Sequence, residues 1–201
     1  MPQDLQADSR SAVATAFTVR PIGYVHSTYS CPEDVPHSHR AWTEDACRIR
    51  LLRRHANGLR GLEGYSHVIV LFWVHRAREW KMPRHHHKPP HVKVFATRMP
   101  VRPNPIGMSV VELVEFNPER GDLVVRGLDA LDATPVLDIK PYIPNFDSRP
   151  DARLPRWVAE HLASHFHGGH EHKGATPGND PGCERHDRNL KARARARKSS
   201  I

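Results

Sequence analysis

The sequence has no apolar run that approaches the roughly 20 residues a bilayer-spanning helix requires, so we expect no membrane partner. The first ten residues, MPQDLQADSR, hold two aspartates and no hydrophobic segment, which argues against a secretory signal. The three cysteines are widely spaced, without a CxxC pair. The simplest interpretation is a reducing, cytoplasmic location in which the thiols are inert or incidental.

The sequence also lacks a GxGxxG motif after a predicted strand, which argues against a Rossmann-type cofactor site. Its formal net charge of +8 is uneven, because five Lys and Arg residues stand between positions 191 and 198. Such a run can bind phosphates without sequence preference, or it can be a solubilising tail. Basicity favours an anionic partner such as nucleic acid, but it says little about the folded core.

Short hydrophobic segments predict a core made of strands. We expect strands at residues 17–27, 46–52, 68–74, 108–116, 123–128 and 136–139, the third being a continuous apolar run typical of a buried strand. A helix is predicted over residues 154–166, where apolar residues and histidines recur at spacings of three and four. Residues 1–16 should be a flexible leader, and residues 168–201 a disordered tail rich in His and Arg.

The central segment is residues 94–109, VFATRMPVRPNPIGMS. A period-two pattern predicts a strand at residues 92–97, after which three prolines remove the N–H groups that a sheet needs. Residues that precede proline are driven toward extended geometry, so residues 102–105 should form a stiff elbow with open carbonyls. With Arg98 and Arg102, the elbow can bind a polar small molecule, or it is a proline-rich hairpin loop with solvated arginines.

This segment resembles the signature of the TrmO family, also called TsaA-like. Two further blocks match: residues 61–67, GLEGYSH, running into LFWVHR, and residues 128–144, which hold LDALDATP and DIKPYIP. With IGYVHS near the start, the resemblance covers about residues 17–147. It implies an all-β fold, a single-sheeted barrel of mainly antiparallel strands at residues 17–150, with the helix in the segment 151–167 that follows.

The resemblance further implies a protein that binds S-adenosylmethionine and N-methylates a threonylcarbamoyl-modified adenosine beside the tRNA anticodon, with a homodimer as the suggested assembly. The cofactor contacts it implies are Pro36, His37, Ser38, His75, Arg76, Arg98, Met108, Asp129, Leu131, Asp132, Ala133, Thr134 and Pro135. His37-Ser38 replaces the Arg-Gln usual in the family. Ala133 replaces the usual Gly, at a backbone dihedral that alanine tolerates.

The residue chemistry suits such a ligand. Arg98 or Arg102 can pair with a carboxylate or a phosphate in bidentate fashion. Asp129 and Asp132 can accept hydrogen bonds from ribose hydroxyls, while the backbone of residues 131–135 and 103–108 can contact the adenine edge. Met108 can pack on the ring.

Methyl transfer from a sulfonium needs mainly proximity and orientation from the protein. A base that takes the proton of the acceptor nitrogen could be Asp138 or Tyr142, both in the DIKPY block. The alternative is that Asp138 and Lys140, which share a strand face by the period of two, form a structural pair that closes the barrel.

Histidine is abundant, with sixteen residues. Three adjacent histidines at residues 85–87 point in different directions, so we predict no metal site there. His161 and His165 are one helical turn apart, and with the histidines of the tail they can form a weak metal site or merely a polar helix end.

Longer bacterial members of the family carry a folded C-terminal domain, and here one helix and the tail follow the barrel. The alternatives to a tRNA methyltransferase are therefore a protein that senses S-adenosylmethionine or a metal, and a methyltransferase with a small-molecule substrate.

Overall fold

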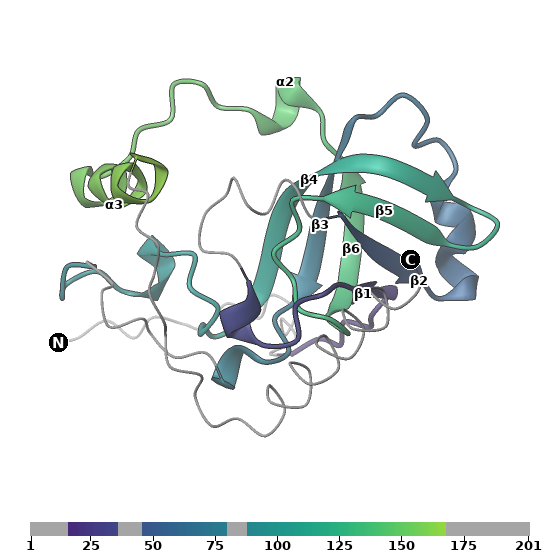
Figure 1. Ribbon diagram of the computed structural model, residues 1–201, viewed down its shortest axis with the longest axis horizontal. Helices are drawn as coiled ribbons and strands as arrows, with labels where there is room; N and C mark the ends of the chain where they lie inside the picture. The colour runs from purple at the N-terminus through teal and green to yellow at the C-terminus, as the bar shows by residue number, and fades with distance from the viewer. Residues whose placement is uncertain (1–15, 36–45, 80–87, 168–201) are drawn as a thin grey trace, which may run out of the picture.

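A computed structural model describes residues 16–35, 46–79 and 88–167, and within them six strands close into one antiparallel barrel (Figure 1). The all-β barrel predicted from the sequence is confirmed. The order around the barrel is β1-β2-β5-β4-β3-β6. The strands are β1 (Gly23–His26), β2 (Ala46–Leu51), β3 (His67–Trp73), β4 (Ile106–Asn117), β5 (Asp122–Arg126) and β6 (Pro135–Pro141).

The described segments between the strands contain short helical turns rather than large insertions. These are η1 (Pro32–Asp34), η2 (Arg53–Leu59), η3 (Ala77–Glu79), η4 (Val94–Ala96) and the one-turn helix α2 (Pro144–Asp147). The predicted C-terminal helix is present as α3 (Arg156–His167), which stands apart from the barrel in Figure 1. No helix among the described residues is long and apolar enough to cross a membrane.

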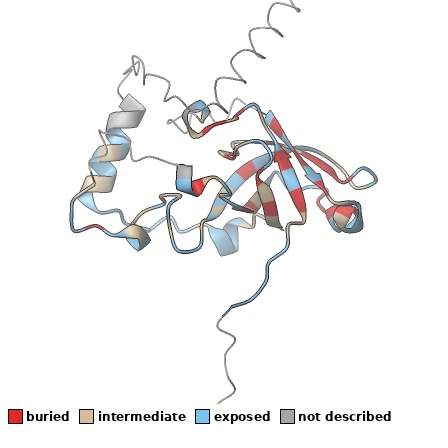
Figure 2. Cartoon of the chain, turned by 90° about the horizontal axis from the view of Figure 1, so that it is seen from below, coloured by how far each residue is buried: buried red, intermediate tan, exposed pale blue. Residues whose placement is uncertain are grey.

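The core lies inside the barrel, where side chains from every strand meet. In Figure 2 the buried residues follow the strands, whereas α3 carries only half-buried and exposed ones where its side chains are described. The alternation of β2 shows the cause, because Cys47, Ile49 and Leu51 point inward while the arginines between them point outward. The most buried strand side chains are Val25, Ile49, Val68, Val70, Val111, Leu123, Val125 and Val136.

Three strand predictions are corrected by the structure. The strand expected at residues 17–27 is limited to β1, since it begins only after Pro21. Residues 92–97 form no strand, because residues 94–96 are the turn η4. The strand β3 is buried on one face only, with Val68, Val70 and Phe72 inside and the residues between them half-buried or exposed.

The long strand β4 lets the barrel close. Its first part pairs with β3, from Ile106 opposite Trp73 to Glu112 opposite His67. Its second part pairs with β5, and the register shifts between Leu113 and Glu115. A bulge of this kind bends a strand and increases its twist, so one strand can serve both neighbours.

The cysteines differ in their state. Cys47 is a buried cysteine on β2 that forms no disulfide. Cys31 is disulfide-bonded, so the interpretation of inert or incidental thiols is wrong for this residue.

The outward arginines of β2 are held by one carboxylate. Asp122 is only 5% exposed, and it accepts hydrogen bonds from Nη1 of Arg48 at 3.1 Å and Nε of Arg50 at 2.9 Å. The hydrogen bond from Arg50 lowers the pKa of Asp122, although its burial acts in the opposite direction. The arginines therefore belong to a network that fastens β2 to β5.

We expect Asp122→Asn to lower the free energy of unfolding by about 1–2 kcal/mol, because it removes the charge from two hydrogen bonds. A carboxyl group with a lowered pKa stabilises the fold above its unfolded pKa, about 3.9, and this contribution is lost as the pH falls through the folded value. The difference between the two proteins should therefore shrink below about pH 4. Denaturant titrations from neutral to acidic pH measure it.

The matched control is Glu119→Gln, which removes the negative charge from the ion pair between Glu119 and Arg60. The side chains of Arg60 and Glu119 are 60% and 76% exposed. Such an exposed pair should contribute less than about 0.5 kcal/mol. Equal losses in both variants would show that the burial of Asp122 adds nothing.

Candidate functional site

One end of the barrel gathers most of the predicted site residues. The antiparallel order brings the ends of β1, β3 and β5 and the starts of β2, β4 and β6 to this end. Three segments lie there: residues 74–76 after β3, residues 94–105 before β4, and residues 127–134 between β5 and β6. We extend the name elbow, used above for residues 102–105, to the whole second segment, and we call the third segment the aspartate loop.

The aspartate loop is fastened to β1 and the residues that follow it. The backbone N–H groups of Asp132 and Ala133 donate to the carbonyls of Tyr29 and Val25 at 2.7 and 2.9 Å. The Asp132 carboxylate accepts the N–H of Ser27 at 3.2 Å. These N–H groups position the loop, which corrects the expectation that they are available to an adenine edge.

The backbone at Ala133 is left-handed, with φ of 60°. Alanine adopts this region at a cost of about 1 kcal/mol, which glycine avoids. The expectation that alanine tolerates this position therefore holds only at a cost in stability. The hydrogen bond from Ala133 to Val25 and the burial of the neighbouring Thr134, 2% exposed, hold it in place.

The elbow is irregular, as its prolines predict, and it is closed by its own polar groups. The Arg102 side chain donates through Nη1 to the carbonyl of Thr97 at 3.2 Å. The carbonyl of Pro105 accepts the N–H of Val74 at 2.7 Å, so the expectation of open carbonyls is wrong for this residue. Nη2 of Arg98 donates to the carbonyl of Met108 at 2.6 Å, which places this exposed guanidinium against the start of β4.

The segment that follows β3, residues 74–76, bridges the other segments. Nδ1 of His75 lies 3.3 Å from Oγ1 of Thr134 in the aspartate loop. The Arg76 side chain donates through Nη1 to the carbonyl of Ser30, beyond β1. The exit of β3 is thereby joined to the aspartate loop and to the segment that follows β1.

A further hydrogen bond joins the aspartate loop to β4, the strand that follows the elbow. Oγ of Ser109 on β4 donates to the Asp129 carboxylate at 2.6 Å. Met108, the adjacent residue, is 46% exposed. Ser109 and Met108 are adjacent strand residues and point to opposite faces of β4. Arginine, aspartate and thioether groups therefore gather at one barrel end, and together they suit a ligand that carries a carboxylate, hydroxyl groups and an apolar ring.

The sequence did not identify Ser27, Tyr29, Ser30 and Ser109, which hold these segments together. Ser27 ends the IGYVHS block and Ser109 ends the central segment, so their place in matched blocks was the one available signal. Their partners are 20 to 105 positions away, at Arg76, Asp129 and Asp132. Contacts at such separations leave no local pattern in a sequence.

A cavity of about 390 Å³ lies next to this assembly, on the β1–β2 side. Its lining includes His26, Ser27, Arg48 and Val124, and Ser27 contacts the aspartate loop. A much smaller one, about 30 Å³, lies beside Arg48 and Asp122. Neither cavity is lined by the exposed residues Arg98 and Met108 or by the buried Thr134.

Residues 24–148 match the family model of the tRNA-methyltransferase O N-terminal domain. The chain belongs to the TrmO family. A probable S-adenosyl-L-methionine-binding protein of Pyrococcus abyssi is 42% identical over 146 residues, which cover 71% of this chain and 77% of that protein. The tRNA (adenine(37)-N6)-methyltransferase of Escherichia coli is 37% identical over 150 residues, which cover 69% and 63%.

A crystal structure of TrmO from Pseudomonas aeruginosa has the same fold, with a TM-score of 0.58 and 39% identity. The match covers 69% of this chain and 62% of that chain. The chain thus spans less than two thirds of the length of the solved TrmO and of the E. coli enzyme. The family and the barrel predicted from the sequence are confirmed, while the predicted domain boundaries and site roles stay predictions.

The remaining TrmO-like site residues fall into two groups. Pro36, His37 and Ser38 lie outside the described residues, as do His85 to His87 and the C-terminal tail, so a cofactor or metal role for them is untested. Leu131 and Pro135 lie at either end of the segment that packs on β1, and Pro135 pairs with Tyr24. Within the described residues no group of three or more His, Cys, Asp or Glu side chains could hold a metal ion.

The two predicted catalytic residues, Asp138 and Tyr142, both lie away from the candidate site. Asp138 forms an ion pair with Nζ of Lys140 at 2.6 Å on the outer wall of β6. It stands opposite Leu71, which in turn stands opposite Met108, so about two strand spacings, roughly 10 Å, separate it from the site. Tyr142 packs edge-on against His67 past the far end of β6 and is not brought to this site within one chain.

Proposed function

We propose that this protein is an S-adenosylmethionine-dependent methyltransferase that N6-methylates an adenosine beside the anticodon of tRNA. The observation that carries the proposal is the meeting of Arg98, Met108 and the aspartate loop at one barrel end, in a chain of the TrmO family. The E. coli relative is named for this reaction, and the Pyrococcus relative for binding the cofactor.

The groups present fit the cofactor. The Arg98 guanidinium would pair with the carboxylate of the methionine part, and Asp129 and Asp132 would accept from the ribose hydroxyls. Met108 offers an exposed apolar surface for the adenine ring. When bound, S-adenosylmethionine would supply a methyl group already activated by the sulfonium, so these residues chiefly bind and orient.

The finer proposal for the acceptor is a threonylcarbamoyl-modified adenosine. Its reacting nitrogen is a weak nucleophile, because its lone pair is delocalised into the ring, and a base that receives its proton assists the reaction. Asp138 is the better placed of the two predicted bases, since it shares the outer wall of the barrel with Met108. Its carboxylate is held in an ion pair with Nζ of Lys140 at 2.6 Å.

The test is nucleoside mass spectrometry of tRNA from a strain that lacks this protein. We expect the loss of one N6-methylated adenosine derivative, with its unmethylated precursor accumulating, and its return when the gene is restored. Purified protein should then methylate that tRNA in the presence of the cofactor. If all methylated nucleosides persist and no tRNA is methylated, the enzyme assignment fails.

The second candidate is a protein that binds S-adenosylmethionine without transferring its methyl group, which the names of the archaeal relatives favour. Saturable cofactor binding without turnover on tRNA would support it. Methyl transfer to a small molecule instead of tRNA would support a methyltransferase that has a small-molecule substrate. Uptake of a metal ion that alters cofactor binding would support a metal sensor.

A homodimer is the assembly we propose, because an apolar ladder covers the outer face of β3 and β4. Trp73 stands opposite Ile106, Leu71 opposite Met108, and Ile69 opposite Val110. Trp73, Ile106 and Val110 are 37%, 47% and 44% exposed. Apolar surface of this kind marks a protein interface, and it includes Met108 of the candidate site.

Val110→Asp should raise the dimer dissociation constant at least about 100-fold, because an unpaired carboxylate would be buried in the interface. The monomer should stay folded, since Val110 is exposed in the single chain. Sedimentation velocity measures the change. Leu154→Asp, at a 59% exposed residue before α3, is the control and should leave the dimer intact. A dimer that tolerates Val110→Asp would exclude this face.

A further inference from the structure

An exposed aromatic side chain stands three residues before Arg98. Phe95 is 81% exposed, and it lies on the turn η4. The turn is held by two backbone hydrogen bonds, Ala96 to Lys93 and Thr97 to Val94, both at 3.1 Å, and by Oγ1 of Thr97 on the Val94 carbonyl at 2.8 Å. Burial of Val92, 7% exposed, anchors its start. The phenyl ring is therefore presented to solvent on a fixed support.

The same stretch carries uncompensated positive charge. Residues 88–111 contain four Lys and Arg residues and no Asp or Glu. Lys88, Arg98 and Arg102 donate to backbone carbonyls, and none of the four cations is in an ion pair within the part of the chain that is described. The arginines of β2 differ, because Asp122 neutralises part of their charge.

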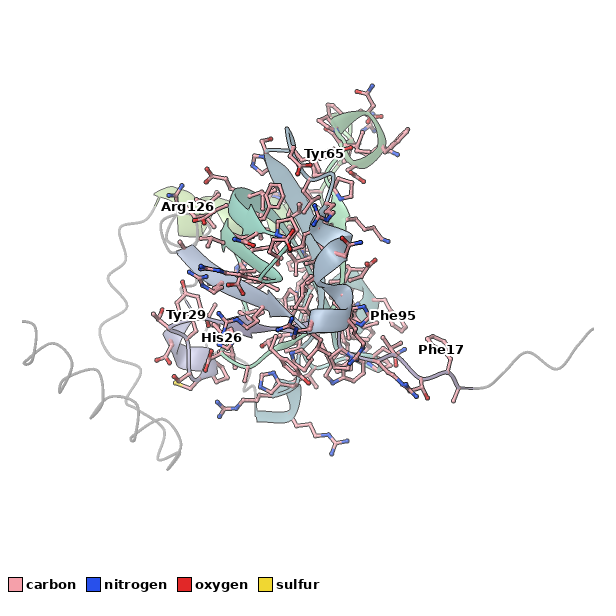
Figure 3. The ribbon with its side chains drawn as sticks, turned by 90° about the vertical axis from the view of Figure 1, so that its right-hand side faces the viewer. Phe17, His26, Tyr29, Tyr65, Phe95 and Arg126 are labelled. Atoms are coloured by element: carbon pink, nitrogen blue, oxygen red, sulfur yellow. The ribbon has the colours of Figure 1, made fainter. Side chains whose placement is uncertain are left out.

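The ring lies toward the barrel end that carries the candidate site. In Figure 3 the side chains of Phe95, His26 and Tyr29 lie toward one end of the molecule, whereas Tyr65 lies toward the other. The elbow, which begins with η4, is tied to this end by the hydrogen bond from Arg98 to Met108. A polymer bound at Phe95 would thus reach the site through the elbow.

We propose that Phe95 stacks on a base of the RNA substrate while Lys93 and its neighbouring cations hold the adjacent phosphates. The inference rests on the proposed function. Exposed aromatic rings set among cations bind single-stranded nucleic acid, because bases stack on the ring and phosphates meet the charges. The target adenosine lies in a loop, where unstacked bases are accessible. Phe95 is here a positioning residue for the RNA and takes no part in cofactor binding.

The test uses the full chain with S-adenosylhomocysteine and an anticodon stem-loop RNA that carries 2-aminopurine in the loop, beside the acceptor position. Phe95→Ala should weaken RNA binding roughly 5- to 150-fold, the range expected for the loss of one stacked base. It should also reduce the quenching of 2-aminopurine fluorescence. Phe95→Tyr keeps the aromatic face and should keep both. Phe146→Ala, at a 71% exposed phenylalanine on α2, is the matched control.

Two further measurements separate stacking from other causes. Cofactor affinity of Phe95→Ala should equal that of the wild type by calorimetry, and its sedimentation coefficient should be unchanged. Lys93→Ala should reduce the slope of log affinity against log salt by about one phosphate contact.

Unchanged RNA affinity in Phe95→Ala would overturn the proposal, and so would a loss that accompanies dissociation of the dimer, because Phe95 would then be a subunit contact. If the wild type neither binds nor methylates tRNA, the proposed function fails first, and this inference fails with it. Tight RNA binding by the wild type without methylation would contradict the enzyme assignment alone. The affinity of Phe95→Ala for the RNA would then still decide whether Phe95 stacks on a base.

Discussion

Gly107→Ala is expected to lower the free energy of unfolding by about 2–3 kcal/mol, since the added methyl group has no room. A Cβ at this position would lie 2.2, 2.4 and 2.8 Å from three ring carbons of Phe72. Phe72 is 5% exposed and belongs to the core inside the barrel, so its ring cannot move without disturbing its neighbours. Chemical denaturation of the purified proteins measures the loss.

The matched control is Gly58→Ala on η2, where an added Cβ meets nothing within 4 Å. It should change stability by less than about 0.5 kcal/mol. Combining Gly107→Ala with Phe72→Leu should recover part of the loss if the clash is its cause. A Gly107→Ala protein as stable as the wild type would show that Phe72 can repack, and that the glycine of the central segment serves some other purpose.

Arg98→Ala is expected to weaken S-adenosylmethionine binding by about 2–3 kcal/mol, or roughly 30- to 150-fold. The guanidinium has five N–H donors, and one of its nitrogens is committed to the carbonyl of Met108. That contact orients the planar group, and a carboxylate would take a bidentate pair from the same group. Titration calorimetry measures the dissociation constant.

Two variants make the Arg98 experiment specific. Arg98→Lys keeps the charge but not the planar fork, so its affinity should fall between those of the wild type and Arg98→Ala. Arg60→Ala removes an arginine that pairs with Glu119 beside η2, and it should bind the cofactor normally. A dissociation constant that is the same in Arg98→Ala and in the wild type would remove this residue from the site.

The parts of the fold that were predicted correctly depend on local chemistry. The alternation of β2 and the prolines of the elbow each determine structure within a few residues, so β2, β4 and the irregular segment were found. Residues 92–97 show the limit of this reasoning, because their alternation of small apolar and other residues resembles a strand. Prolines at positions 89, 90 and 100 flank the segment, and it forms one helical turn instead of pairing.

The site was predictable as a set of segments but not as an arrangement. His75 and Thr134 are 59 residues apart and Ser109 and Asp129 are 20 apart, yet each pair is in contact. Only the closure of the barrel brings them together. The same closure carries Tyr142 away from Arg98, which residue chemistry alone could not show.

We expect the elbow and the aspartate loop to bind S-adenosylmethionine together. Amide chemical-shift mapping during titration with the cofactor tests it most directly, since every segment is observed in one experiment. We predict that the largest shifts fall in residues 74–76, 97–109 and 127–135. Shifts confined to the cavity between His26 and Arg48, or none at saturating cofactor, would contradict it.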